Sequence, residues 1–268
     1  MKIKEITAFP IRITRDEEDE GKERPAVIDY GDYFVDETAF TSIYSKHHET
    51  TVIKIETDTG IVGWGEAQSP VSPRTTQTIV EDLVRPLILG RDPFDIEAIW
   101  TRNYGAMRER GHPTGFYIDA IGGTDIALWD IVGKATGKPV HKLAGGRYRD
   151  KVKLYAGMGG VDPQKVADEA EEHVGYGYQA LKLHLLLDAD GVAEIASAVR
   201  KRVGPKIMLM VDTHMRQSVQ SAIKLGRALE KLDFTWLESP IVPEDIPGAV
   251  ALSEALDMAV AIGEWGRT

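Results

Sequence analysis

The chain has 268 residues, of which 43% are hydrophobic, and it carries a formal net charge of −10. This length is enough for one large core or two linked ones, and the acidic balance argues against a nucleic-acid-binding surface, which needs a basic face. The absence of cysteine excludes disulfides, thiolate zinc sites and a cysteine nucleophile, so any metal must be held by carboxylates and imidazoles.

The N-terminal residues have the pattern of neither a signal peptide nor a membrane span. They run quickly into acidic residues, in MKIKEITAFPIRITRDEEDE, without the apolar core of a signal peptide. No apolar run in the chain approaches the length of about 18 residues that a membrane helix needs. We therefore expect a cytoplasmic protein that binds neither nucleic acid nor a membrane.

The first part of the chain, up to about residue 70, has the pattern of β-strands. Alternation of apolar and polar residues predicts strands in KIKEITAFPIRI, TTVIKIETDTG and IVGWGEA, with a turn at Asp58-Thr59-Gly60 between the last two. A charged stretch, Thr14–Glu49, separates the first two strands. Stretches of this length are often lids or binding loops, and a disordered insertion is the alternative.

Residues 74–150 have helical periodicity. Three helical segments are predicted, each closed by glycine or followed by proline: TTQTIVEDLVRPLILG, PFDIEAIWTRNYGAMRER and FYIDAIGGTDIALWDIVGKATG. Together with the strands, they predict an α+β N-terminal domain over residues 1–145.

After Gly145-Gly146, apolar strands alternate with amphipathic helices up to the end of the chain. Five strands are predicted, in KVKLYAGMG, ALKLHLLL, KIMLMVD, FTWLES and AVAIGE, and a helix lies between each pair. This alternation indicates a parallel sheet that is buried on both faces. A doubly wound sheet would give the same pattern, but the regular repeats and the absence of a Gly-rich phosphate fingerprint favour a TIM-type (β/α) barrel over residues 146–268.

Acidic residues follow three successive strands at equal intervals along the chain: Asp212, Glu238 and Glu264. In a parallel barrel the carboxyl ends of the strands share one face, so these carboxylates should converge. Three such charges repel unless a cation lies between them, and all-oxygen ligation suits Mg²⁺. The alternative is that each acidic side chain caps the helix that follows it.

Three basic residues are candidates for proton transfer near these carboxylates. Lys182 lies within an apolar strand, where burial and neighbouring charges can bring a lysine near the pKa of a general base. His184 has the same side-chain parity, and His214 lies two residues past Asp212. The alternatives are that Lys182 extends to the solvent at the rim of the barrel and that His214 is an exposed loop residue.

The segment AIGGTDIALWDIVGKATGKPVHKLAGG, residues 120–146, resembles the signature of the mandelate racemase and muconate lactonizing enzyme branch of the enolase superfamily. The matching residues are Ala120, Asp125, Ala127, Leu128, Trp129, Asp130, Lys134, Gly137 and Pro139. WGEA near Gly65 resembles the end of the β-meander in the family's N-terminal capping domain. The resemblance covers essentially the whole chain.

The resemblance implies that Asp212, Glu238 and Glu264 are the family's three metal ligands. Lys182 matches the first lysine of the second-strand Lys-x-Lys motif, but His184 replaces the second lysine, which is usually the base. Asp212-Thr213-His214 is similar to the Asp-x-His motif of acid-sugar dehydratases, in which the histidine is the general acid. Racemase-like members more often have asparagine at that position.

We therefore expect a Mg²⁺-dependent homo-oligomeric enzyme that removes the proton α to the carboxylate of a small acid sugar and stabilises the enediolate. A lyase that dehydrates the sugar is the first hypothesis, and an isomerase of the same branch, a racemase or cycloisomerase, is the second. A further alternative is a truncated, catalytically silent protein that folds only as an oligomer or with another chain.

The predicted barrel has five strands, whereas a complete (β/α) barrel has eight. An open parallel edge would expose unpaired backbone groups. The expectation from the sequence is a chain truncated after the fifth strand, or one whose sheet another chain completes, with little or no turnover alone.

Overall fold

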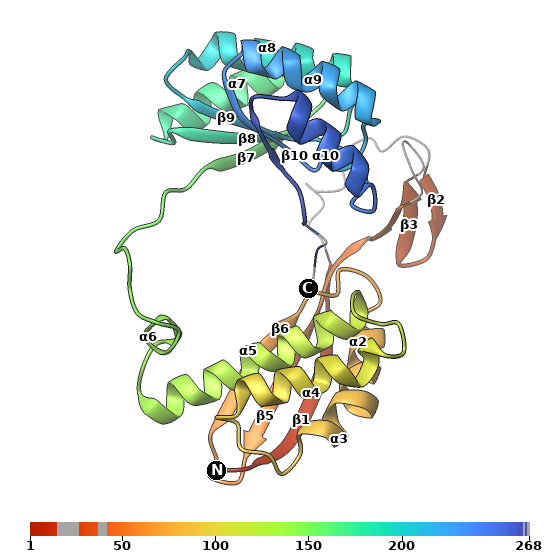
Figure 1. Ribbon diagram of the computed structural model, residues 1–268, viewed down its shortest axis with the longest axis vertical. Helices are drawn as coiled ribbons and strands as arrows, with labels where there is room; N and C mark the ends of the chain where they lie inside the picture. The colour runs from red at the N-terminus through yellow and green to blue at the C-terminus, as the bar shows by residue number, and fades with distance from the viewer. Residues whose placement is uncertain (15–26, 37–41, 265, 267–268) are drawn as a thin grey trace. The chain divides into compact units, whose positions relative to one another are not determined.

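The computed structural model describes residues 1–14, 27–36, 42–264 and 266, which form two compact units, with the boundary along the chain between Asp150 and Lys151 (Figure 1). Each unit has its own hydrophobic core. None of the helices in the described part of the chain combines the length and the apolar composition of a membrane span.

The first unit contains an antiparallel sheet in the order β1-β5-β6. Its strands are β1 (Ile3–Thr14), β5 (His47–Thr57) and β6 (Val62–Ala67). Gly60 has a φ of 84°, and its N–H donates to the carbonyl oxygen of Thr57 at 3.1 Å. The predicted strands and the turn at residues 58–60 are therefore confirmed. Alternate side chains of β5 are buried, as expected for a strand with one face on the core.

A second antiparallel sheet lies within the stretch that was interpreted as a loop, Thr14–Glu49. It consists of β2 (Val27–Tyr30), β3 (Tyr33–Asp36) and β4 (Ser42–Ser45), in the order β2-β3-β4. The loop interpretation was wrong for these residues, since their backbone groups pair in a ladder. The rest of the stretch, 15–26 and 37–41, lies outside the described residues.

Arg12 connects this small sheet to the larger one. Its Nε donates to Oε1 of Glu49 at 2.6 Å, and its guanidinium also pairs with Asp32 in the turn between β2 and β3. The Glu49 side chain is fully buried. A buried carboxylate requires such a partner, so the base of the small sheet is held by a charge pair.

The helices of the first unit agree with the three predicted helical segments, apart from one irregularity and one further short helix, α6. They are α2 (Pro73–Ile79), η1 (Val80–Val84), α3 (Arg85–Ile88), α4 (Ile96–Arg108), α5 (Phe116–Thr136) and α6 (Val140–Leu143). The first predicted segment is interrupted by the π-helical turn η1. In Figure 1, α5 lies along the sheet beside β6.

Close packing of α5 against β6 explains the two glycines of β6. A Cβ atom on Gly63 would lie 2.1 Å from the carbonyl oxygen of Ala127, and one on Gly65 would lie 2.0 Å from that of Gly123. Backbone at such distances cannot move away cheaply, so only glycine allows this approach.

Two charged residues of the signature also fasten α5 to β6. Asp130 accepts a hydrogen bond from the backbone N–H of Trp64 at 2.8 Å. Lys134 Nζ donates to Asp130 at 2.6 Å and to the carbonyl oxygen of Val62 at 2.8 Å. These residues of the signature therefore stabilise the unit by pairing backbone groups along β6.

The second unit contains a five-stranded parallel sheet in the order β11-β10-β9-β8-β7. Its strands are β7 (Ala156–Gly159), β8 (Ala180–His184), β9 (Met208–Asp212), β10 (Phe234–Glu238) and β11 (Ala259–Ala261). This confirms the five predicted strands and their parallel arrangement.

The first of these strands is shorter than predicted. Residues 151–155 were expected to be part of it, but β7 begins at Ala156. Val152 and Leu154 alternate as in a strand, yet they are 73% and 71% exposed. The apolar side chains of this segment therefore alternate as in a strand but do not pack against a core.

A helix follows each strand from β7 to β10. The helices are α7 (Pro163–Gly175), α8 (Ala189–Val203), α9 (Val219–Lys231) and α10 (Ile246–Ala255). In Figure 1, α7, α8 and α9 lie side by side along one face of the sheet, and the unit's core lies between these layers. The continuous apolar strands are explained by this burial.

At the amino end of the sheet, Arg200 on α8 binds two connecting turns. Its guanidinium donates to the carbonyl oxygens of Gly204 at 2.8 Å and Ile207 at 2.7 Å before β9, and to those of Leu232 at 2.7 Å and Asp233 at 2.8 Å before β10. Four carbonyl groups, which would otherwise need solvent or other partners, are thereby satisfied by one side chain.

Candidate active site at the carboxyl ends of the parallel strands

The carboxyl ends of β8, β9 and β10 bring together most of the predicted site residues. On β8, Leu181 and Leu183 are fully buried against the helices, so Lys182 and His184 face the opposite side of the sheet. His184 pairs in register with Asp212 on β9, which in turn pairs with Glu238 on β10. Three adjacent strands therefore carry these side chains at one level.

The ammonium group of Lys182 lies between two of the predicted metal ligands. Its Nζ is 2.5 Å from Oε1 of Glu238 and 3.1 Å from Oδ2 of Asp212. The three side chains are 18%, 22% and 7% exposed in the order Lys182, Glu238 and Asp212. Lys182 is therefore not an exposed rim residue, because its charged end lies within the carboxylate pair.

The protonation of Lys182 differs from the expectation that its pKa would fall toward that of a general base. Burial lowers its pKa, but hydrogen bonds from the ammonium to Glu238 and Asp212 outweigh burial, and the pKa lies above its ordinary value. In this arrangement Lys182 is a cation that compensates two carboxylates.

His184 and His214 lie beside each other, next to these carboxylates. Their ring centroids are 5.5 Å apart, with an angle of 73° between the ring planes. Burial lowers the pKa of His184, and the positive charge of Lys182 acts in the same direction, while Asp212 opposes it. A neutral imidazole at His184 can accept a proton.

The loop after β9 holds His214 in an uncommon backbone conformation. Its φ is 45°, in the left-handed region, and its backbone N–H donates to Oδ1 of Asp212 at 3.0 Å. Ser239, directly after Glu238, also has a left-handed φ of 41°. Non-glycine residues in this region carry a conformational cost and concentrate at functional sites.

Asp212 and Glu238 are not the caps of the helices that follow them, contrary to the alternative that each acid caps a helix. Helix α9 is capped by the side chain of Ser218, and α10 by that of Asp245. Asp212 and Glu238 therefore do not cap the helices that follow their strands. Both carboxylates are instead directed toward Lys182.

Glu264 was expected at the end of a longer fifth strand. The strand β11 ends at Ala261, and Glu264 is exposed in the turn beyond it. Its charge acts on His184, which places it in the same region. Within the described part of the chain, however, no three acidic or histidine side chains form a group that could hold a metal ion.

The donor set agrees with a hard divalent cation. Oxygen atoms of Asp212 and Glu238 already converge on one cation, the ammonium of Lys182. Carboxylate oxygens are the ligands that Mg²⁺ prefers. Two of the three predicted ligands are thus brought together, and Glu264 lies nearby.

Trp236 was not predicted as part of the site. It precedes Glu238 by two residues on β10, and its indole Nε1 donates to Oε2 of Glu238 at 2.9 Å. The shared parity of the two residues was the only signal in the sequence.

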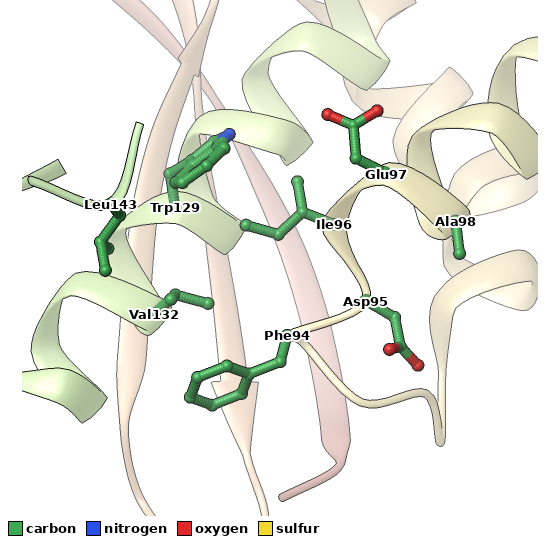
Figure 2. Close-up of a pocket in the computed structure, with 8 residues that line it drawn as sticks. All are labelled: Phe94, Asp95, Ile96, Glu97, Ala98, Trp129, Val132 and Leu143. Atoms are coloured by element: carbon green, nitrogen blue, oxygen red, sulfur yellow. The ribbon is translucent and has the colours of Figure 1, made fainter. Parts of the chain in front are cut away.

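A pocket lies elsewhere, in the first unit, and has a volume of about 460 Å³. Its lining residues come from the turn before α4, from the start of α4, from α5 and from α6: Phe94, Asp95, Ile96, Glu97, Ala98, Trp129, Val132 and Leu143. Figure 2 shows the side chain of Ile96 pointing toward Trp129 and the carboxylate of Asp95 pointing away from it. None of the predicted catalytic or metal-binding residues lines this pocket.

Comparison with known families matches both parts of the chain. Residues 36–145 match the family described as mandelate racemase / muconate lactonizing enzyme, N-terminal domain. Residues 165–268 match the family described as enolase C-terminal domain-like.

Individual relatives agree with these matches. A D-galactarolactone cycloisomerase from Agrobacterium fabrum is 34% identical over 80% of this chain and 57% of its own length. A D-galactonate dehydratase family member from Streptomyces bingchenggensis is 33% identical over 81% of this chain and 60% of its own length. The chain thus spans less than two thirds of these curated relatives.

Among solved structures, a racemase from Streptomyces coelicolor with bound magnesium superimposes with a TM-score of 0.80 at 27% identity. The match covers 98% of this chain and 69% of that one.

Proposed function

Since the chain belongs to the mandelate racemase and muconate lactonizing enzyme branch of the enolase superfamily, we propose that it acts on an acid sugar as a dehydratase. The reaction would begin with removal of the proton α to the sugar's carboxylate and end with loss of the β-hydroxyl group as water. The observation that carries this proposal is the arrangement of Lys182, Asp212 and Glu238 beside His184 and His214.

Mg²⁺ would be held by Asp212, Glu238 and Glu264. Support comes from the convergence of Asp212 and Glu238 on one cation and from the magnesium-bound racemase among the solved structures. When bound, the metal supplies Lewis-acid stabilisation of the charge that develops on the substrate carboxylate.

The chain's own basic residues would move the protons. His184 is proposed to accept the α-proton, because burial favours its neutral form. His214 is proposed to protonate the departing hydroxyl, in the role of the histidine in the Asp-x-His motif. Lys182, as a cation beside the carboxylates, would attract and orient the acidic substrate.

A second candidate function is a cycloisomerase or racemase of the same branch. The 34% identity to a D-galactarolactone cycloisomerase favours it, because that relative matches the chain as well as the dehydratase family member does. Both candidates begin with the same proton abstraction, so they differ in the step assigned to His214.

The test is incubation of the purified protein with Mg²⁺ and a panel of acid sugars, with products identified by mass spectrometry. A product that has lost one water and carries a 2-keto-3-deoxy group supports the dehydratase. A product with an unchanged formula supports the isomerase. No turnover of any sugar, which is the result expected if the five-stranded sheet needs another chain to complete it, would overturn both as activities of this chain alone.

One substitution separates the two proton transfers. In His214→Asn we expect dehydration to stop while exchange of the α-proton with D₂O continues, because His184 is still present. His141→Asn is the control, since His141 is exposed on α6 of the first unit. Loss of both reactions in His214→Asn would contradict the assigned roles.

We further propose that residues 1–145 form the family's capping domain and that residues 146–268 form part of a TIM-type (β/α) barrel, with β7–β11 as its first five strands. The parallel strand order and the match to the solved racemase support this. A cytoplasmic homo-oligomer remains our proposal for the protein's location and assembly.

A further inference from the structure

We propose that Trp236 is a positioning residue that fixes the carboxylate of Glu238 in the orientation needed to bind a divalent cation. The inference rests on the proposed metal site, to which it adds a residue that is not itself a ligand. Its basis is the set of contacts that Glu238 makes in the second unit.

The two carboxylate oxygens of Glu238 have separate partners. Oε2 accepts a hydrogen bond from the indole Nε1 of Trp236 at 2.9 Å, while Oε1 lies 2.5 Å from Nζ of Lys182. The indole contact leaves Oε1 directed toward the cation that it shares with Asp212. Rotation of the carboxylate would break the contact with Trp236.

The backbone places the indole where this bond can form. Trp236 and Glu238 are two residues apart on β10, so their side chains lie on the same face of the sheet. Both are paired on two sides, with β9 and with β11. A residue on a central strand is held more rigidly than one on a loop, which favours a precise contact.

The ring of Trp236 is itself supported from the side. The aromatic ring of Tyr155, just before β7, meets it edge to face, with centroids 6.2 Å apart and an angle of 77° between the planes. Such edge contacts are favourable because the positive ring edge meets the negative ring face. Tyr155 therefore limits the movement of the indole.

The chemistry of the indole suits this role. Its N–H group can only donate, so it binds Glu238 through a lone pair of a carboxylate oxygen. The indole does not titrate, so its donor is present over a wide pH range. A donor of this kind neither competes for the metal nor removes the carboxylate's charge. Partners that orient metal ligands in this way typically change metal affinity by about 10- to 100-fold when removed.

The test compares Trp236→Phe, which keeps a ring but removes the N–H group, with the unmodified protein. Calorimetric titration with Mg²⁺ should show about 10- to 100-fold weaker binding in the variant. Trp64→Phe is the matched control, because Trp64 is 45% exposed on β6 in the first unit, and its Mg²⁺ affinity should be unchanged. The melting temperature without metal, measured in parallel, should be nearly the same in Trp236→Phe and in the unmodified protein.

The indole N–H resonance of Trp236 distinguishes positioning from a general structural effect. This resonance is identified by its absence in Trp236→Phe, and it should move in the Glu238→Ala protein, because the indole then loses its acceptor. In the unmodified protein it should also shift on addition of Mg²⁺. A resonance that moves in neither experiment would overturn the proposal.

The outcomes separate this inference from the proposed function. Mg²⁺ binding by the unmodified protein together with equal binding by Trp236→Phe would overturn the positioning role and leave the metal site in place. Failure of the unmodified protein to bind Mg²⁺ would overturn the metal site, and the positioning role with it.

Discussion

The ammonium of Lys182 and the carboxylate of Glu238 approach within 2.5 Å, although 56 residues separate them in the sequence. Oδ2 of Asp212 lies 3.1 Å from the same ammonium. Two carboxylates thus depend on one cation, and each change to this group should alter both stability and metal binding.

Replacement of the cation should destabilise the metal-free protein. In Lys182→Met we expect the free energy of unfolding to fall by about 1.5–3 kcal/mol, because Asp212 and Glu238 lose a charged hydrogen-bond donor and repel each other. Urea unfolding with and without Mg²⁺ measures this, and Mg²⁺ should stabilise the variant more than the unmodified protein.

The matched control is Lys224→Met. Lys224 contacts Asp190 at 2.7 Å, but the two side chains are 69% and 77% exposed. Solvent screens the attraction in an exposed pair, so little change in the free energy of unfolding is expected. Equal effects of the two substitutions would contradict the special role of Lys182.

Removal of one carboxylate should abolish Mg²⁺ binding. We expect no measurable heat of binding in Glu238→Ala, since a weakly chelated hard cation does not tolerate the loss of a ligand. Asp212→Ala and Glu264→Ala should behave in the same way. Glu254→Ala, at an exposed position of α10, is the control. Unchanged affinity in Glu264→Ala would remove that residue from the ligand set.

Stability should decrease in mildly acidic solution because of His184. Its pKa in the folded protein lies below the ordinary value of 6.5, chiefly through burial. Between these two values the unfolded chain binds more protons, so the free energy of unfolding falls as the pH falls through this range, and levels off below the folded pKa. His184→Gln should remove this part of the pH dependence. An NMR titration of the metal-free protein checks the pKa directly, and a value above 6.5 would contradict the burial argument.

Addition of one methyl group to β6 at Gly65 should disrupt its packing against α5. Gly65→Ala would place a Cβ atom 2.0 Å from the carbonyl oxygen of Gly123. We expect the free energy of unfolding, measured by thermal unfolding, to fall by about 3 kcal/mol or more. Gly122→Ala is the control, because nothing lies within 4 Å of its added Cβ atom. There the gain in helix propensity should stabilise the protein by about 0.5–1 kcal/mol.

The alternation of strands and helices in the second unit could be predicted because burial under helices imposes a continuous apolar pattern on each strand. The same reasoning failed for residues 151–155, where Val152 and Leu154 alternate correctly but remain exposed. A strand needs a pairing partner as well as a pattern. The small sheet β2-β3-β4 was missed because its short strands carry little apolar alternation.

The sequence predicted which residues form the candidate site better than it predicted their protonation states and contacts. The spacing of Asp212 and Glu238 indicated that they would approach each other, since parallel strands end on one face. Whether Lys182 would lose or retain its proton depends on distances of a few ångströms to these carboxylates, which no sequence pattern specifies. The indole bond of Trp236 depends in the same way on side-chain geometry.

The Arg200 contacts at the opposite end of the sheet have a practical consequence for labelling. The hydrogen bonds of Arg200 to the two turns go to main-chain oxygens, so they do not depend on which side chain an exposed turn residue carries. Lys206 is exposed in one of them, and the chain contains no cysteine. A Lys206→Cys variant would therefore offer a single thiol for a spectroscopic probe, at the end of the sheet far from the carboxylates.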